Sequence, residues 1–537
     1  MRILAAALAC GLLWSTPSFG QDAGSYVPQS SNLVLRWKNP QASIERAENF
    51  MMRVGLVPPG TEKGFLLQQL QAQTPALASM DLSQPVWVAG FGSADDPKPM
   101  MVFSLKKGAD PKAIASVING ARIVRHGGIV IALDQSLPAE LGKKKQKQSY
   151  RFASAGVAER SNVTVDLVGE MLQKIMSGST GAQPELAGLE KAMAQFYEDM
   201  KGLTIGANLT GEALMMTMGS VYDKGSTYTQ GLAKMRNEEG SVLKGLPKGQ
   251  YALVGGGSAS QLSEQSLPMV QSMIQSMKPA FAANESTAPL ASQLDELVRL
   301  IGESFGATQK TFFGLEIPGG LETTRVVGYS EGDSAKMKKA MRDLFDWVKT
   351  TLAKASEASG QEAPIELVKS DKPSKQAGVA FDSYGFALRG EEAVSIRGEM
   401  GPLARLLDQR MQIGAVSKSK SVFVWSSDAA FIQQAVTAAK APKPFLASSP
   451  RFKAASDALP NARIAEYFLD VGPIAAAIMS MRIPAMASTV RSALGTVPPI
   501  GYTVSKASGA EIRADVFVPL QLVEAGIGLS QLFQGGT

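Results

Sequence analysis

Hydrophobic and polar positions along the chain form two patterns, one typical of strands and one typical of helices. Residues 203–209 alternate between apolar and polar side chains, which predicts a strand with one covered face. After Asp333, apolar residues from Met337 to Val348 recur at helical spacing, which predicts an amphipathic helix lying on a sheet.

These segments recur in a fixed order. A strand, a short turn and a helix follow one another from residue 33, from residue 251 and from residue 464, with turns at 39–40, 255–257 and 471–473. We expect the triple glycine at 255–257 to be a helix-entry turn. Elsewhere a strand pair leads into a helix capped by an aspartate, at Asp110, Asp333 and Asp428.

His126-Gly127-Gly128 interrupts an apolar stretch as a tight hairpin would, and this favours antiparallel sheet. We therefore predict an α+β fold of repeated units, each of mainly antiparallel sheet with amphipathic helices packed on one face. Turn-rich stretches divide the chain into units at residues 21–150, 151–240, 241–355, 356–445 (degenerate) and 446–537.

The amino terminus has the features of a bacterial signal peptide, which we assign to residues 1–20. Arg2 precedes an uncharged apolar run at 3–14, and small residues favour cleavage between Gly20 and Gln21. The run is shorter than the ~20 residues that a membrane span needs. We expect a periplasmic or secreted protein, with a lipid anchor at Cys10 as the alternative.

Composition is that of a globular protein, with 45% hydrophobic and 19% charged residues. Cys10 is the one cysteine, so the chain after Gln21 has neither a disulfide nor a thiolate site. The net charge of +6 is small, and its clearest cluster, at 143–147, is expected in a solvated loop. Contact of that cluster with anionic lipid or envelope polysaccharide is the alternative; we do not expect nucleic-acid binding.

Part of the chain resembles a known family. Its motifs are Trp425-Ser426-Ser427-Asp428 with the following helix, residues 445–453, Leu459-Pro460 and residues 466–470. This stretch, about 420–475, resembles a bacterial family of exported repeat proteins known only as a domain of unknown function. The resemblance implies an exported repeat fold and supplies no catalytic residue.

Catalytic and metal chemistry has weak support in the sequence. His126 is the single histidine, which excludes a zinc site with several histidines, and we expect it in a turn. Ser241 with Lys244, and Ser417 with Lys420, have the spacing of a serine-lysine hydrolase, but no companion motif accompanies either pair. The glycines at 255–257 lack the Gly-Lys-Ser/Thr ending of a phosphate loop.

Methionine is abundant, with 24 residues in the chain. Met269, Met273 and Met277 recur at i, i+4 and i+8, a spacing that places them on one helix face. Core packing is the simplest interpretation. The alternatives are a copper(I) site and a pliable face for an apolar ligand.

These features together predict a non-catalytic envelope protein with a binding or scaffold role, without cofactor or metal. Expected partners are an envelope protein, a lipid or a polysaccharide, and we expect no membrane span after removal of the signal. A periplasmic carrier of lipid or another apolar ligand is the first alternative, and a serine-lysine hydrolase is the second.

Overall fold

The computed structural model describes most of the chain after the predicted signal peptide. The described residues are 23–93, 95–110, 120–138, 140–143, 145–146, 149–177, 198–283, 288–291, 293–359, 365–370, 374–388, 395, 397–398, 401–445 and 449–534. The predicted signal peptide with Cys10, Gly20 and Gln21 lies outside them, as do Lys144, Lys147 and the helix expected after Asp110.

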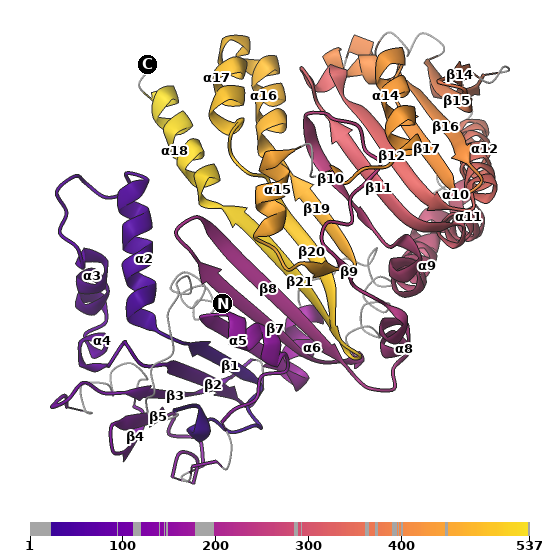
Figure 1. Cartoon of the computed structure of the whole chain (residues 1–537). Helices are drawn as coiled ribbons and strands as arrows, with labels where there is room; N and C mark the ends of the chain where they lie inside the picture. The colour runs from indigo at the N-terminus through magenta and orange to yellow at the C-terminus, as the bar shows by residue number, and fades with distance from the viewer. Residues whose placement is uncertain are drawn as a thin grey trace. The chain divides into compact units, whose positions relative to one another are not determined.

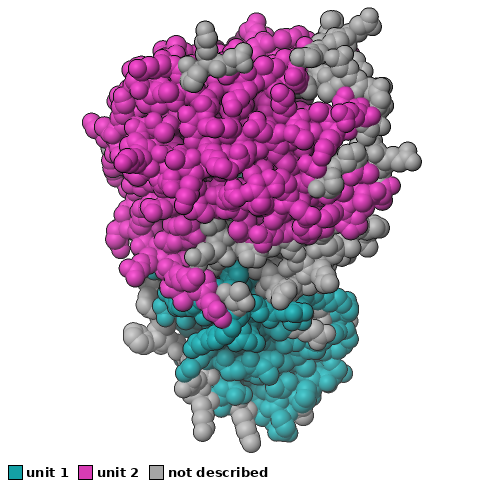
Figure 2. Space-filling view, turned by 90° about the vertical axis from the view of Figure 1, so that its right-hand side faces the viewer, with its two compact units in different colours: residues 1–181, 196–229, 507–537 teal, residues 182–195, 230–506 magenta. Residues whose placement is uncertain are grey.

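The chain forms two compact units (Figure 2). Unit 1 comprises residues 1–181, 196–229 and 507–537, and unit 2 comprises residues 182–195 and 230–506. Unit 1 is therefore assembled from segments on both sides of unit 2 in the sequence. The five repeat units at 21–150, 151–240, 241–355, 356–445 and 446–537 stay a prediction.

Unit 1 contains an antiparallel sheet in the order β4-β5-β3-β2-β1-β6-β7-β8-β21. Its strands are β1 (Leu33–Trp37), β2 (Val86–Phe91), β3 (Lys98–Ser104), β4 (Arg122–His126), β5 (Ile129–Leu133), β6 (Val163–Val168), β7 (Met200–Leu209), β8 (Ala213–Tyr222) and β21 (Glu511–Pro519). The hairpin predicted at His126-Gly127-Gly128 is confirmed, since β4 pairs with β5 around it.

Helices accompany this sheet (Figure 1). They are the 3-10 helix η1 (Ala23–Tyr26) and the α-helices α2 (Pro40–Arg53), α3 (Phe65–Gln73), α4 (Ala76–Ser79), α5 (Ala155–Arg160), α6 (Gly169–Ser177) and α18 (Leu520–Gln534). The predicted start of α2 is confirmed, because the Asn39 side chain accepts a hydrogen bond from the Ala42 amide at 2.9 Å. The helix α8 (Thr227–Lys234) follows β8 where the chain passes into unit 2.

The strands of unit 2 also pair antiparallel, in the order β20-β19-β10-β11-β12-β17-β16-β15, with β13 and β14 both paired to β15. Its strands are β10 (Tyr251–Gly257), β11 (Thr308–Glu316), β12 (Arg325–Gly332), β13 (Ile365–Lys369), β14 (Ser374–Gln376), β15 (Val379–Leu388), β16 (Arg410–Ser417), β17 (Lys420–Trp425), β19 (Ala465–Leu469) and β20 (Ile500–Ser508). The short strands β9 (Glu238–Glu239) and β18 (Ala462–Arg463) form a separate pair.

The helices of unit 2 include two long ones. They are α9 (Ala259–Ala283), α10 (Ala288–Ala291), α11 (Leu294–Ala307), α12 (Ser334–Ser359), α14 (Ala429–Lys440), α15 (Pro450–Asp457), α16 (Val471–Arg482) and α17 (Pro484–Leu494), with the 3-10 helices η4 (Leu321–Thr323) and η5 (Gly401–Leu406). The caps predicted for α12 and α14 are confirmed, because Asp333 and Asp428 accept hydrogen bonds from backbone amides of the first turns.

One pairing scheme occurs in both units. The strand β1 lies between β2 and β6, and β3 pairs with β5. In unit 2, β10 lies between β11 and β19, and β12 pairs with β17. The antiparallel α+β class is thereby confirmed.

The expectation that helices pack on one face of each sheet is not confirmed. In unit 2, Met341 of α12 packs with Phe423 of β17, whereas Phe452 of α15 packs against Phe468 of β19 at 5.8 Å between ring centroids. The register aligns Phe423 with Tyr467, the neighbour of Phe468, and adjacent residues of a strand face opposite sides. Helices therefore cover both faces of this sheet.

The triple glycine at 255–257 is not a helix-entry turn, and that expectation is wrong. All three residues belong to β10 and pair with both β11 and β19. A Cβ at Gly255 would lie 2.1 Å from Cδ1 of Tyr467, and a Cβ at Gly257 would lie 2.4 Å from the carbonyl oxygen of Ile464. The glycines thus allow close approach of neighbouring strands inside the sheet.

Candidate ligand-binding site

Three hydroxyl side chains lie in one row across the sheet of unit 2. Thr311 of β11 is paired with Ser330 of β12, and Ser330 is paired with Ser421 of β17. Thr311 Oγ1 and Ser330 Oγ share a hydrogen bond of 3.2 Å. The alternation of side chains along each strand places all three on the same face.

The next row on that face consists of two aromatic rings with a glycine between them. Phe313 is paired with Gly328, and Gly328 is paired with Phe423. A Cβ at Gly328 would meet its nearest atom, Cβ of Phe423, at 3.5 Å, which is an ordinary contact. The missing side chain of Gly328 therefore leaves a hollow between the two rings.

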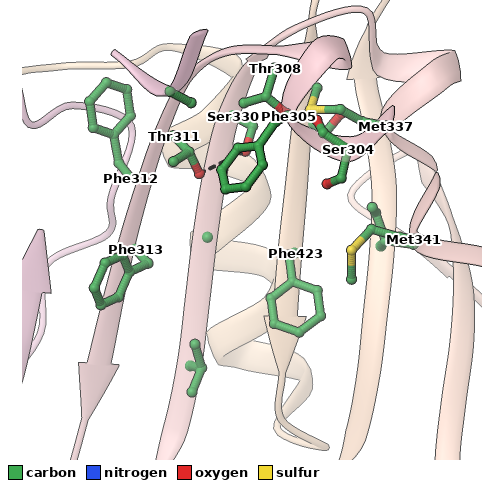
Figure 3. A pocket seen from close by; sticks show the side chains of 15 residues that line it. Ser304, Phe305, Thr308, Thr311, Phe312, Phe313, Ser330, Met337, Met341 and Phe423 are labelled. Carbon is green, nitrogen blue, oxygen red and sulfur yellow. Dashed lines mark hydrogen bonds between the residues drawn. The ribbon is translucent and has the colours of Figure 1, made fainter. Parts of the chain in front are cut away.

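Two helices roof this hollow. The helix α11 contributes Ser304 and Phe305, and α12 contributes Met337 and Met341. Figure 3 shows the Phe305 ring over the strands, with Phe423 and Met341 beside the same space. Because Phe rings and Met thioethers offer no strong hydrogen-bonding groups, this roof is apolar except for the hydroxyl of Ser304.

The hollow is a cavity of about 360 Å³, within the ~300–1,000 Å³ typical of small-molecule sites. Its lining is Ala259, Ser304, Phe305, Thr308, Thr311, Phe312, Phe313, Val326, Gly328, Ser330, Met337, Met341, Ile413, Ser421 and Phe423. Among these described residues none carries a charge. The cavity therefore suits an apolar molecule with few polar atoms.

One lining hydroxyl is buried and unpaired. Ser421 is 4% exposed, and its Oγ has no hydrogen-bond partner among the described residues. A buried polar group without a partner costs ~1–3 kcal/mol, and most such groups in folded proteins are satisfied. An oxygen or nitrogen of a bound molecule would satisfy this one.

Apolar surface continues along the sheet beyond the cavity. From β20 to β16, the row after Phe313 and Phe423 is apolar: Ile500, Leu469, Leu253, Leu315, Val326, Trp425 and Met411. It continues through Tyr384 of β15 to Lys369 of β13. Leu469 and Tyr502 are each 37% exposed, unusually high for large apolar side chains on a sheet. The ring of Tyr467 lies 6.0 Å from that of Tyr502 and 6.4 Å from that of Phe313, both in tilted arrangements.

The charged groups of β12 belong to the opposite face, whereas Asp382 of β15 lies on the cavity face, in the row of Ile413, and pairs with Lys338 and Arg342 of α12. Glu331 of β12 accepts a hydrogen bond from Tyr329 at 2.8 Å and forms an ion pair with Lys244 at 3.0 Å. Burial alone would raise the pKa of Glu331, but the bonds from Lys244 and Tyr329 outweigh burial and lower that pKa. Tyr329 and Glu331 alternate with Gly328 and Ser330, so these charges point away from the cavity.

Of the residues singled out from the sequence, the methionines at 269, 273 and 277 all belong to α9. The side chains of Met269, Met273 and Met277 lie outside the described part of the chain, so the ligand face assigned to them stays a prediction. The cavity methionines are instead Met337 and Met341, which belong to the helical pattern after Asp333.

The two serine-lysine pairs have other partners. Ser241 donates to the Glu466 carboxylate, while Lys244 pairs with Glu331. Ser417 Oγ accepts from the Ser419 amide at 3.3 Å in the turn between β16 and β17. In the described residues no side-chain hydrogen bond joins either serine to its lysine.

His126 is the last residue of β4 and not a turn residue as expected, because the turn consists of Gly127 and Gly128. Its Nε2 lies 2.7 Å from the carbonyl oxygen of Gly142, and its ring stacks on Tyr26 at 4.8 Å. Within the described residues, no group of three or more His, Cys, Asp or Glu side chains is arranged to hold a metal ion.

Sequence reasoning missed the cavity. Its signals were present in the alternation of Thr311, Phe313 and Leu315 and in Gly328, a glycine inside an apolar strand. Which strands place their side chains beside one another could not be read from the sequence, because β12 pairs with β17, about ninety residues away.

Comparison with protein-family models, with curated proteins and with solved structures found no match. The resemblance of residues 420–475 to an exported repeat family therefore stays a prediction. In the described part of the chain, no helix combines the length and apolarity that crossing a membrane requires.

Proposed function

We propose that this chain is a non-catalytic binding protein that holds an apolar small molecule in the cavity of unit 2. The observation that supports the proposal is a cavity of about 360 Å³ lined by phenylalanine and methionine side chains. Apolar ligands bind such sites because surface removed from water contributes ~25 cal/mol per Å².

A packing defect is the alternative explanation of the cavity. Protein interiors hold few voids larger than a water molecule, whose share of liquid volume is ~30 Å³. The cavity is about ten times that size, and it contains an unpaired buried hydroxyl at Ser421. Both facts favour a binding site over imperfect packing.

We further propose that the chain is exported and acts in the periplasm or outside the cell. The support is the signal-peptide pattern of residues 1–20. Amino-terminal sequencing of the protein from its native host should begin at Gln21. A mature protein beginning at Met1 would contradict export, and one beginning at Cys10 would indicate a lipid anchor.

The binding proposal is tested by filling the cavity. Gly328→Leu places a side chain in the hollow, where the nearest atom to the added Cβ is 3.5 Å away. We expect binding of the uncharged fluorophore N-phenylnaphthylamine to weaken at least tenfold, which is ~1.4 kcal/mol. Fluorescence titration of the purified chain measures it.

Gly385→Leu is the matched control. Gly385 lies in β15 of the same sheet and does not line the cavity, and a Cβ there would meet Arg410 Cγ at 3.8 Å. This variant should bind the fluorophore as the unmodified chain does. Equal affinity in all three proteins, or no binding by the unmodified chain, would reject the proposal.

A further inference from the structure

We infer that the ligand of this cavity is an uncharged amphiphile, such as a long-chain alcohol or ester, whose oxygen-bearing end pairs with Ser421. This inference rests on the proposed function and specifies its ligand class. It depends on three properties of the cavity: the absence of charge in its described lining, the position of the hydroxyl row and the unpaired state of Ser421.

The lining selects against charge of either sign. A carboxylate, phosphate or ammonium group in this cavity would lose its hydration without meeting an opposite charge, since none of the described lining residues is ionisable. An unpaired buried ion is far more costly than a buried hydroxyl. Fatty-acid anions and charged phospholipid headgroups are therefore disfavoured inside the cavity.

The hydroxyl row fixes the polar end of the ligand. Thr311 and Ser330 use one hydrogen bond between themselves, whereas Ser421 Oγ is free to donate and to accept. A ligand hydroxyl or carbonyl oxygen beside Ser421 would form one hydrogen bond that the chain does not supply.

The apolar part of the ligand then lies along β12. From Ser330 through Gly328 to Val326 the lining changes from hydroxyl to open space to aliphatic, over about 13 Å at ~3.3 Å per residue. Phe313 and Phe423 border this path on the two neighbouring strands. One polar end and one apolar path describe a single-headed amphiphile.

The experiment compares three ligands with the same alkyl chain: dodecanol, dodecanoate and dodecylammonium. Each competes with N-phenylnaphthylamine for the purified chain at about pH 8, where the acid and the amine are both charged. We expect dodecanol to displace the fluorophore at concentrations at least tenfold lower than either ion.

The Ser421→Ala variant tests the polar contact. We expect dodecanol to bind it about fivefold more weakly, the equivalent of one hydrogen bond, while the affinity for the fluorophore stays unchanged. Thr503→Val is the control, because Thr503 Oγ1 is also buried and unpaired but does not line the cavity. This control should bind dodecanol normally.

Failure of this inference and failure of the proposed function give different results in these experiments. If dodecanoate or dodecylammonium competes as well as dodecanol, or if Ser421→Ala leaves dodecanol binding unchanged, the inference is wrong although apolar binding stands. If the fluorophore and all three ligands fail to bind, both the inference and the proposed function are wrong.

Discussion

Glu466 is fully buried in β19 and pairs with Arg463, which is 2% exposed, at 2.6 Å. The Leu243 amide also donates to Glu466, at 3.0 Å, and Ser241 donates to the same carboxylate. The serine that suggested a hydrolase thus holds the segment at 241–243 against β19. A structural role explains its position.

Removing the charge of Glu466 should strongly destabilise unit 2. Glu466→Gln leaves the Arg463 guanidinium buried without its counter-charge, for which we expect a loss of ~3–5 kcal/mol in the free energy of unfolding. Urea denaturation of the variant and the unmodified chain measures this loss of free energy. The control is Asp457→Asn, which breaks the exposed pair with Lys453 and should have no measurable effect; equal losses in the two variants would contradict this explanation.

Asp166 in unit 1 gives a prediction on pH. Burial raises its pKa, although Thr204, the Ala153 amide and Tyr150 donate hydrogen bonds to it. The folded state therefore keeps this proton to higher pH than the unfolded state does. Relative to Asp166→Asn, the free energy of unfolding should fall as pH rises from ~3.9, the unfolded value, through the raised folded value.

Urea denaturation at pH 4 and pH 7 measures this difference. Asp134→Asn is the control with the opposite sign, because hydrogen bonds from Ser136 lower the pKa of Asp134. Relative to Asp134→Asn, the unmodified chain should keep nearly all of its stability margin from pH 7 to pH 4 and lose it as pH falls below ~3.9 through the lowered folded value. A stability margin over Asp166→Asn that grows with pH would contradict the assignment for Asp166.

At the scale of single elements, local signals in the sequence were sufficient for many boundaries. Asn39 and Asp428 begin helices as predicted, because a side-chain oxygen satisfies amides of the first turn wherever the fold places it. The residues at 255–257 were misassigned because glycine is compatible with a turn and with a crowded strand. Neighbours that are far away in sequence, such as the side chain of Tyr467 and the backbone of Ile464, distinguish the two.

The cap of α14 gives a prediction at this scale. Asp428 accepts from the amides of Ala430 at 2.9 Å and Phe431 at 3.3 Å. Asp428→Ala should lower the free energy of unfolding by ~1–2 kcal/mol. Asp428→Asn should retain most of the stabilisation by the cap, because asparagine also caps helices. Thermal unfolding measures both variants, with Gln434→Ala on the exposed face of α14 as the control; an unchanged Tm for Asp428→Ala would exclude a capping role.

For the chain as a whole, the sequence predicted the α+β fold class but not the order of the strands in the sheet. Antiparallel sheet followed from alternation and hairpin signals within short windows. Strand order depends on pairs that are distant in sequence, such as β1 with β6 and β8 with β21. Such pairs are determined by packing across the sheet, for which a single sequence carries no local signal.

Truncation tests the division into units. A chain ending at Lys506 lacks β21, which pairs with β8 along its whole length, and α18, whose Leu520 packs with Leu209. Amide hydrogen exchange should show loss of protection in β8 while β12 of unit 2 stays protected. A chain ending at Gln534 keeps both elements and should match the unmodified protein; protection lost equally in β8 and β12 would contradict independent units.

The discontinuity of unit 1 has a consequence for the order of events during synthesis. Residues 230–506 all precede the last segment of unit 1, so unit 2 can reach its native contacts before that segment is available for pairing. The edge of β8 has no strand partner from β21 until residues 511–519 appear. During that interval it is an unpaired strand edge open to misassociation, and a chaperone that binds such edges would act on this protein at that stage.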